Sequence, residues 1–247
     1  MNNLKVKTSY DQFAGSYHNY MDDSHNFWNK WLEYPHTIRF LNSQDLKDKN
    51  VLDLGCGSGR YTKEFVRLGA KVSGIDKSEK LIEIAERELP NVEFKVGSVE
   101  KLPYQNSSFD YVFSGLVIDY LPDLKKAFSE VCRVLKPGGS FLFSGHVPYS
   151  FLTTKVKGTE PQAFLLGNYF EEGKFEREWA PLNLKQIQYH HTFQTLVGAL
   201  VQNNLYITEY LDMKPDEEAE RSGLKDYYEA FMKPKFYLIK ATKVITK

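Results

Sequence analysis

The sequence predicts one α/β domain built on a doubly wound, mostly parallel β-sheet. Between residues 49 and 146, short apolar runs alternate with segments of helical periodicity, which is the pattern of successive βαβ units. The first apolar run leads straight into the glycine-rich stretch GCGSG at 55–59. In an open parallel sheet, the turn after the first strand is where the chain approaches a nucleotide-like ligand.

The elements of this core have recognisable ends. Ser78 and Asp123 are suited to cap the helices that follow them, because their side chains accept hydrogen bonds from backbone N–H groups. Pro90 and the KPGG stretch at 136–139 end those helices. We therefore expect strands at 50–55, 71–76, 92–97, 109–115 and 140–145, separated by helical segments.

Two less regular regions flank this core. Residues 8–42 are helical in pattern and rich in aromatic side chains, and we interpret them as an N-terminal helical lid. Residues 147–188 lack clean periodicity, so we interpret them as a cap inserted for the substrate. The final part, 189–247, reads as a helix and two strands at one sheet edge. The whole chain, 1–247, is thus expected to be a single domain around a core at 49–146.

Composition limits the possible partners. Lys plus Arg and Asp plus Glu both total 32, so no net field attracts nucleic acid or anionic lipid. No apolar stretch approaches the ~20 residues that span a bilayer, and the N-terminus lacks the apolar core of a secretory signal. Cys56 and Cys132 are the only cysteines and form no CxxC motif. We expect a cytoplasmic protein without a metal site, a disulfide framework, a membrane partner or a nucleic-acid partner.

The spacing of the glycines distinguishes between nucleotide ligands. Gly55, Gly57 and Gly59 give G-x-G-x-G, whereas a dinucleotide site has G-x-G-x-x-G, and the P-loop sequence G-K-[ST] is absent. Asp53, two residues before the first glycine, would repel a diphosphate and attract a cationic ligand. Asp76 closes the second predicted strand, where a carboxylate can accept both ribose hydroxyls. An NAD(P)-dependent oxidoreductase is therefore disfavoured but stays an alternative.

Four motifs in order resemble one enzyme family. They are VLDLGCGSGRYT, GIDKS, GSVEKLPYQNSSFDYVFSG and EVCRVLKPGGSFLF, preceded by YDQFAGSY near the N-terminus. Together they are similar to the class I S-adenosylmethionine-dependent methyltransferases, in particular the type 11-like branch that acts on small molecules and on quinone or biotin precursors. The resemblance implies a Rossmann-like sheet of seven strands with an antiparallel edge strand. It also implies S-adenosylmethionine as cofactor and S-adenosylhomocysteine as product.

The resemblance also implies roles for residues along the strand ends. The glycine turn and its acidic neighbour would meet the methionine part of the cofactor, the carboxylate after the second strand would hold the ribose, and the third-strand end would border the adenine. The end of the fourth strand would lie near the sulfonium. The cofactor-binding residues implied in this way, with a tyrosine of the N-terminal region added, are Tyr17, Asp53, Gly55, Cys56, Gly57, Asp76, Lys77, Ser98, Val99, Ser114 and Leu116.

Two departures from the family pattern concern the site. Many members have Asp where this chain has Ser98, and a hydroxyl accepts the hydrogen bond of the adenine amino group more weakly than a carboxylate does. Members often carry His at one or both of the positions of Asp119 and Tyr120. These departures would also suit a non-catalytic protein that binds S-adenosylmethionine in regulation, which is a second alternative.

Candidates for catalysis follow the fifth strand and the cap. His146 is a possible general base, although it could equally be a loop histidine satisfied by the backbone. His190 and His191 are expected to begin the helix after the cap, where at most one would face the site. Tyr17 and Tyr10 lie seven residues apart and could share a helical face over the cofactor, with core packing as the rival interpretation.

The reaction expected from these features is transfer of a methyl group to an O, N or C nucleophile of a small molecule. In-line displacement at a sulfonium requires alignment and exclusion of water more than a catalytic triad. A base is needed only when the nucleophile arrives protonated. We expect a small-molecule acceptor and a monomer or homodimer.

Overall fold

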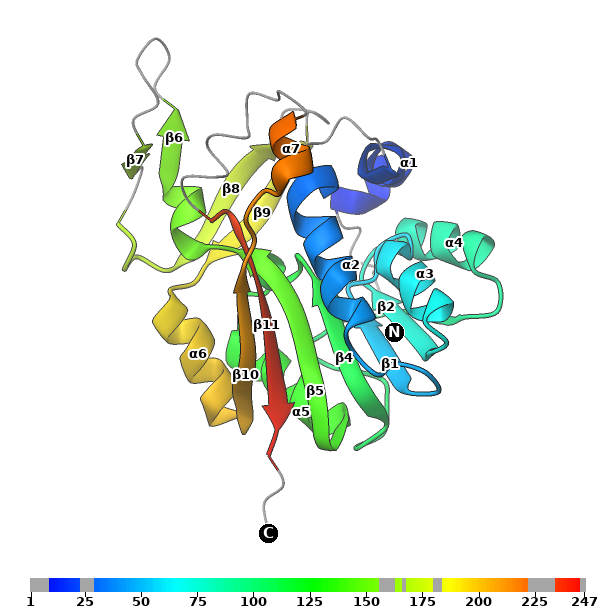
Figure 1. Cartoon of the computed structure of the whole chain (residues 1–247). Helices are drawn as coiled ribbons and strands as arrows, with labels where there is room; N and C mark the ends of the chain where they lie inside the picture. The colour runs from blue at the N-terminus through cyan, green and yellow to red at the C-terminus, as the bar shows by residue number, and fades with distance from the viewer. Residues whose placement is uncertain are drawn as a thin grey trace, which may run out of the picture.

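The computed structural model describes residues 9–22, 29–155, 163–165, 168–179, 184–221 and 234–244. One sheet of seven strands forms its centre (Figure 1), with spatial order β10-β11-β5-β4-β1-β2-β3. The strands are β1 Asn50–Leu54, β2 Lys71–Asp76, β3 Glu93–Val96, β4 Phe109–Gly115, β5 Leu135–His146, β10 Leu205–Asp212 and β11 Phe236–Lys243.

The first five strands of the chain pair in parallel, and β11 runs antiparallel to both β5 and β10. The predicted seven-stranded, mostly parallel sheet with an antiparallel edge is confirmed. In this arrangement the carboxyl ends of β1, β2, β4 and β5 meet at one edge of the sheet. Ligands of open α/β sheets bind at this edge.

Helices cover both faces of the sheet (Figure 1). The α-helices are α1 Ser9–Asp22, α2 Tyr34–Asn42, α3 Arg60–Arg67, α4 Glu79–Glu88, α5 Leu124–Val134, α6 Phe193–Gln202 and α7 Glu217–Arg221. Shorter turns are the π-helix η1 Asn29–Glu33 and the 3₁₀-helices η2 Ile118–Tyr120 and η3 Pro148–Leu152. Two hairpins, β6 Thr153–Lys155 with β7 Ala163–Leu165 and β8 Gly173–Trp179 with β9 Leu184–His190, lie outside the main sheet.

The hydrophobic core has a layer on each face of the sheet. On one face, Phe128 of α5 packs with Phe141 and Phe143 of β5. On the other face, Phe65 of α3 packs with Phe113 of β4. Residues on both sides of the parallel strands are therefore buried, as expected for a doubly wound sheet.

The predicted helix starts are confirmed. Ser78 Oγ accepts the N–H of Leu81 at 3.2 Å, and Asp123 Oδ1 accepts the N–H of Lys126 at 3.0 Å. Each side chain satisfies one of the N–H groups that a helix leaves without an internal partner. These caps fix where α4 and α5 leave the carboxyl edge of the sheet.

The prediction that His190 and His191 begin a helix is wrong. His190 is the last residue of β9, and α6 starts only at Phe193, after Thr192 has accepted the N–H of Thr195 at 3.2 Å. Side-chain burial alternates along β9, with Gln186 and His190 buried. Such alternation is the period of a strand, which the pairing with β8 satisfies. Within the predicted cap at 147–188, residues 156–162, 166–167 and 180–183 lie outside the described part.

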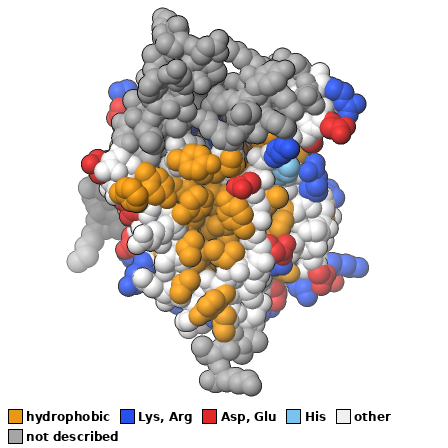
Figure 2. All heavy atoms as spheres, turned by 60° about the vertical axis from the view of Figure 1, so that its left-hand side comes forward, with side chains coloured by type: hydrophobic (Ala, Val, Ile, Leu, Met, Phe, Trp, Pro, Cys, Tyr) orange, Lys and Arg blue, Asp and Glu red, His pale blue; other side chains and the backbone are white. Residues whose placement is uncertain are grey.

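The edge of the sheet at β10 is apolar. Figure 2 shows hydrophobic side chains gathered on the face to which α6 and β10 belong. Exposed members are Val197 and Val201 of α6 together with Ile207 and Tyr210 of β10. Among the described helices, none is both long and apolar enough to cross a membrane.

Candidate active site

The turn between β1 and α3 requires glycine for two reasons. Gly55, Gly57 and Gly59 have φ values of 74°, 55° and 89°, in the left-handed region that other residues rarely adopt. At Gly55, a Cβ atom would also lie 2.4 Å from Cγ2 of Val117. The backbone is therefore bare at the carboxyl edge, which suits close contact with a small molecule.

Asp76 joins this turn to the start of α4. Its Oδ2 accepts the N–H of Gly57 at 3.0 Å, and its Oδ1 accepts the N–H of Ser78 at 2.8 Å. Burial raises the pKa of the Asp76 carboxyl, while the two backbone donors lower it. Each carboxylate oxygen has more than one acceptor site, so both can still accept a hydroxyl of a bound ligand.

Asp53 lies beneath the turn and points toward α3. It is buried, and its Oδ2 accepts the hydroxyl of Thr62 at 2.6 Å. Burial raises the pKa of Asp53 to about 7, with a further increase from the Asp76 charge, although Thr62 lowers it. Asp53 therefore supports the first turn of α3, where Gly59 offers no capping side chain.

Helix α1 lies over the glycine turn and the start of α4. Asp11 Oδ1 accepts the hydroxyl of Ser78 at 2.7 Å, and His18 Nδ1 lies 3.0 Å from the Ser58 hydroxyl. The rings of Tyr10 and Tyr17 meet edge to face, with centroids 5.0 Å apart. The two tyrosines thus share one side of the helix. Burial raises the pKa of the Tyr17 hydroxyl, so it stays protonated and uncharged.

A ring of three hydrogen bonds ties α1 to the rest of the carboxyl edge. The hydroxyls of Tyr10 and Tyr120 lie 2.8 Å apart, Tyr120 donates to Oε1 of Gln186 at 2.9 Å, and Nε2 of Gln186 donates to Tyr10 at 2.9 Å. Gln186 is buried on β9. Sequence reasoning missed Gln186 and gave Tyr120 no contact, because their partners lie more than sixty residues away along the chain.

The residues expected near the adenine and the sulfonium have different surroundings. Lys77 is exposed, and Ser98 Oγ accepts the N–H of Glu100 at 3.2 Å. The side chain of Val99 is buried in the core, so only its backbone is left to border a ligand. Ser114 lies within β4 and not after it, and its buried hydroxyl donates to the carbonyl of Leu54 at 3.0 Å.

Two other residues of the predicted cofactor set are Leu116, which has an unusual backbone conformation, and Cys56, which has a buried side chain. Leu116 has a φ of 57°, and its N–H donates to the hydroxyl of Ser144 at 3.2 Å. Cys56 is buried, and burial holds the pKa of its thiol well above the ordinary value. A protonated thiol is a poor nucleophile. Cys56 therefore contributes to the turn through its backbone.

His146 forms a pair with Asp119 at the carboxyl end of the sheet. Nδ1 of His146, the last residue of β5, lies 2.7 Å from Oδ2 of Asp119 in η2. The two side chains are only 12% and 8% exposed. Burial lowers the pKa of His146, and the Asp119 charge acts in the opposite direction. In the neutral ring, the proton on Nδ1 faces the carboxylate and Nε2 is the basic nitrogen.

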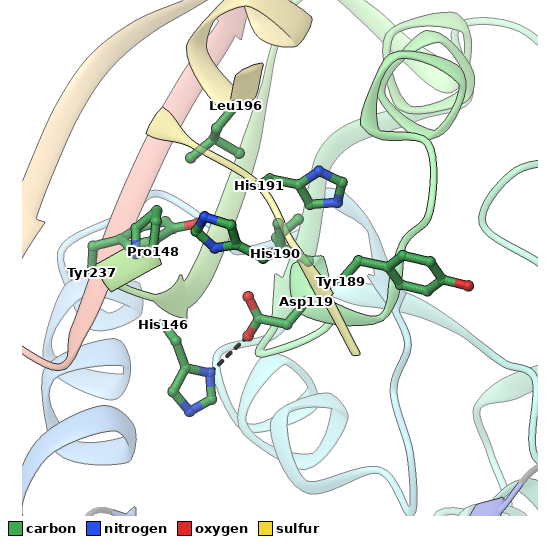
Figure 3. A pocket seen from close by; sticks show the side chains of 9 residues that line it. Asp119, His146, Pro148, Tyr189, His190, His191, Leu196 and Tyr237 are labelled. Atoms are coloured by element: carbon green, nitrogen blue, oxygen red, sulfur yellow. Dashed lines mark hydrogen bonds and ion pairs between the residues drawn. The ribbon is translucent and has the colours of Figure 1, made fainter. Parts of the chain in front are cut away.

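Both histidines after the cap line the same small cavity as this pair. Figure 3 shows His146 and Asp119 pointing toward one another, with His190 at the end of the strand beside them and His191 just after it. The sequence predicts that at most one of these two faces the site, whereas both line this cavity, because the strand ends between them. The cavity volume is about 10 Å³, room for one water molecule. Its lining residues are Ile118, Asp119, His146, Pro148, Tyr189, His190, His191, Leu196 and Tyr237.

The two histidines differ in their hydrogen bonds. Nε2 of His191 lies 2.7 Å from the carbonyl of Leu121, and Nε2 of His190 lies 2.8 Å from the carbonyl of Tyr169. Each Nε2 must carry a proton to donate to a carbonyl, so Nδ1 of neutral His190 is an acceptor. This buried Nδ1 has no hydrogen-bond partner. Within the described ranges, no group of three or more His, Cys, Asp or Glu is placed to hold a metal ion.

One buried carboxylate was missed entirely by the sequence reasoning. Glu33, at the end of η1, is 1% exposed and accepts the hydroxyls of Thr37, Tyr61 and Ser144. Nothing in its local sequence distinguishes it from a surface glutamate. Its burial is set by partners on α2, α3 and β5, so no local signal could have found it.

The glycine turn, Asp76 and the seven-stranded sheet with its antiparallel edge define the class. The chain is a class I S-adenosylmethionine-dependent methyltransferase. Residues 52–143 form a type 11 methyltransferase domain, since the sequence model of that family, described as a methyltransferase domain, matches them. A solved S-adenosylmethionine-dependent methyltransferase from Mesorhizobium loti superimposes with a TM-score of 0.73 at 25% identity, covering 85% of this chain and 97% of that one.

Two curated relatives are similar over part of the chain. A demethylmenaquinone methyltransferase of Chlorobaculum tepidum is 28% identical over 61% of this chain and 64% of its own length. A ubiquinone biosynthesis O-methyltransferase of Coxiella burnetii is 31% identical over 44% of this chain and 49% of its own length. The chain thus spans less than two thirds of either relative.

The residues present fit S-adenosylmethionine. The positive φ values of Gly55 and Gly57 keep the turn free of side chains where the ligand would approach, and Asp76 offers two acceptor oxygens at the end of β2. The buried carboxyl groups of Asp53, beneath the turn, and of Glu33, linked through Ser144 to the N–H of Leu116, suit a cationic ligand better than a diphosphate. The glycine spacing and these carboxylates together disfavour the oxidoreductase alternative.

Proposed function

We propose that this protein transfers a methyl group from S-adenosylmethionine to a hydroxyl oxygen of a small molecule, with His146 as general base. The observation that carries the proposal is the 2.7 Å contact between Nδ1 of His146 and Oδ2 of Asp119 at the carboxyl end of β5. A hydroxyl nucleophile arrives protonated and needs a base, whereas a neutral amine does not.

The pair supplies a base of the right kind. Asp119 accepts the Nδ1 proton, which fixes the ring orientation, and Nε2 is the nitrogen proposed to take a proton from the acceptor hydroxyl. Because burial lowers the pKa of His146, the ring is neutral near pH 7, as a base must be. When bound, S-adenosylmethionine supplies a methyl group on a positively charged sulfur that leaves as a neutral thioether.

The cofactor residues inferred from the sequence keep their roles as part of this proposal. Gly55 and Gly57 contact the methionine part, with Asp53 beneath them, and Asp76 accepts the ribose hydroxyls. The backbone of Cys56 completes the glycine turn. The remaining proposed contacts are Lys77, Ser98 and Val99 at the adenine, Ser114 and Leu116 at the sulfonium, and Tyr17 over the cofactor.

Helix α1 and the β8–β9 hairpin act as lid and cap in this proposal. The hydrogen-bonded ring of Tyr10, Tyr120 and Gln186 supports the idea, because it closes α1 against β9 above the carboxyl edge. Closure excludes water from the reacting atoms. Nδ1 of His190, buried beside the cavity that His146 also lines, is proposed to accept a hydrogen bond from the methyl acceptor.

The acceptor is proposed to be an uncharged aromatic molecule with a hydroxyl group. The names of the two quinone-related relatives support this class, as do the aromatic side chains around the site. Acidic and basic residues are equal in number, 32 each, so the protein has no net positive charge to attract a nucleic acid acceptor. The two reduced cysteines favour a cytoplasmic protein, which we propose works as a monomer or homodimer.

A set of matched acceptors tests the nucleophile. Purified protein is incubated with S-adenosylmethionine and one of three ring compounds that differ only in carrying a hydroxyl, an amino or a methoxy group. Formation of S-adenosylhomocysteine and of the methylated product is measured. We expect turnover with hydroxyl compounds only, and transfer confined to the amino compounds would contradict the proposal. Binding of S-adenosylhomocysteine without any transfer to hydroxyl, amino or carbon acceptors would favour a regulatory protein.

A further inference from the structure

The strongest unexplained feature outside the His146 pair is the buried carboxylate of Glu33. It lies at the junction of η1 and α2, and its hydrogen bonds come from three different elements. Ser144 of β5 donates to Oε1 at 2.7 Å, Thr37 of α2 donates to Oε1 at 3.2 Å, and Tyr61 of α3 donates to Oε2. A carboxylate that accepts three hydroxyls and donates nothing is arranged as an anion.

The carboxylate of Glu33 forms no ion pair with any described lysine, arginine or histidine, and all of its hydrogen bonds come from neutral hydroxyls. Arg60, which is close enough to lower the pKa of Tyr61, lies over the ring of Tyr34 with its guanidinium carbon 3.8 Å from the ring centroid. Burying a carboxylate without a positive partner lowers the stability of the fold. Binding of a positively charged ligand group at Glu33 would therefore be favourable.

Glu33 is connected to the end of β4. Ser144 Oγ donates to Glu33 and also accepts the N–H of Leu116 at 3.2 Å. Two hydrogen bonds therefore join the carboxylate to the backbone proposed to lie near the sulfonium. Tyr61, the third donor, touches the other side of this strand end, since a Cβ at Gly115 would lie 2.7 Å from its ring.

Tyr17 relates Glu33 to the ribose end of the site. The pKa of Tyr17 is raised chiefly by burial, and also by charges that include both Asp76 and Glu33. Both carboxylates are thus near enough to act on this tyrosine of α1. In the cofactor position proposed above, the ligand runs from Asp76 along the glycine turn toward Leu116, whose N–H shares the Ser144 hydroxyl with Glu33.

We infer that Glu33 binds the α-ammonium group of the methionine part of S-adenosylmethionine. The ligand chemistry is a primary ammonium, which can donate to a carboxylate oxygen in a charge-assisted hydrogen bond. Tyr61, Thr37 and Ser144 hold the carboxylate in place as positioning residues. The inference rests on the cofactor position proposed above and is independent of the nature of the methyl acceptor.

Calorimetric titration with two ligands tests the inference. One ligand is S-adenosylhomocysteine, and the other is its deamino analogue, in which hydrogen replaces the ammonium group and the carboxylate is kept. We expect the wild-type protein to bind S-adenosylhomocysteine about 10- to 100-fold more tightly than the deamino analogue. In Glu33→Gln, this preference is expected to fall to within about threefold, while the deamino analogue keeps its affinity.

Glu64→Gln is the matched control, because Glu64 also accepts a tyrosine hydroxyl, that of Tyr34 at 2.9 Å, but contacts Arg67 at 2.8 Å. It is expected to keep the wild-type preference. Glu33→Asp serves if Glu33→Gln does not fold, since it keeps the charge but withdraws it by one methylene, and a reduced preference is expected.

Three results would overturn the inference. They are equal binding of the two ligands by the wild type, an unchanged preference in the folded Glu33 variant, and a loss that affects only S-adenosylmethionine and leaves S-adenosylhomocysteine untouched. The last would place Glu33 at the sulfonium. Absence of any S-adenosylhomocysteine binding by the wild type would instead overturn the proposed cofactor position, so the two failures are distinguishable.

Discussion

Nδ1 of His146 and Oδ2 of Asp119 lie 2.7 Å apart, although the whole of α5 and most of β5 lie between the two residues along the chain. The parallel order of β4 and β5 brings both to the carboxyl edge of the sheet. A buried histidine held by a carboxylate is an arrangement suited to general base catalysis.

Removal of the base is expected to slow the chemical step. His146→Asn should lower kcat by about 10²- to 10⁴-fold, which is the usual contribution of a general base, with little change in S-adenosylhomocysteine affinity. Rates are measured as S-adenosylhomocysteine formed with the best hydroxyl acceptor. His36→Asn, on the half-buried outer side of α2, is the control. A normal rate in His146→Asn would remove the histidine from the mechanism.

The pH dependence should show the titration of His146. Burial lowers its pKa from the ordinary 6.5, and a base acts only when unprotonated. We expect kcat/KM to rise on an acid limb with an apparent pKa below 6.5 and to be level at neutral pH. Because the Asp119 charge raises the pKa of His146, Asp119→Asn should move this limb to lower pH. An unchanged limb in that variant would contradict the coupling between the two groups.

Steric crowding at the glycine turn should make a substitution at Gly55 destabilising. In Gly55→Ala, the new methyl group would lie 2.4 Å from Val117, and the alanine would keep a φ of 74°. The free energy of unfolding should therefore fall by about 1–3 kcal/mol. Adding Val117→Ala to Gly55→Ala should restore only the stability lost through the steric clash, because the unfavourable φ of residue 55 remains. Gly198→Ala is the control, since it lies in α6 with nothing within 4 Å of its Cβ and should be stabilising. Urea unfolding measures all three variants, and equal effects at both glycines would contradict the account.

Asp53 should make stability depend on pH. Its pKa rises from 3.8 to about 7 on folding, so the folded protein binds the proton more tightly than the unfolded chain. The favourable contribution is fully present below pH 3.8 and is lost as pH rises through about 7. Asp53→Asn keeps an acceptor for Thr62 and should flatten the stability profile over this window, by an amount on the order of a few kcal/mol. Parallel profiles of the two proteins in urea unfolding between pH 4 and 8 would disprove this.

Local sequence was sufficient to predict where the glycine turn and Asp76 lie. Gly55 and Asp76 lie at strand ends that apolar runs and helix caps mark clearly, so their positions follow from neighbours in the chain. The succession of the five core strands along the chain follows for the same reason, whereas their spatial order does not. The edge pair β10–β11 was also predicted, as two strands in the last part of the chain.

The acceptor end depends on contacts that sequence does not show. His190 was misread as a helix start, because the period of β9 is visible only when it pairs with β8. Gln186 meets Tyr10 across 176 positions, and Glu33 meets Ser144 across 111. Such buried polar contacts are set by tertiary packing, and local propensity carries no signal of them.

The most direct test of the central claim is calorimetric titration with S-adenosylhomocysteine, with NAD as the comparison ligand, on the wild type and on Asp76→Ala. We expect binding of S-adenosylhomocysteine at micromolar concentration, none of NAD, and a loss of at least about tenfold in the variant, because charge-assisted hydrogen bonds to the ribose disappear. Binding of NAD by the wild type, or unchanged affinity in Asp76→Ala, would contradict the account of the glycine turn and of the carboxylate beside it.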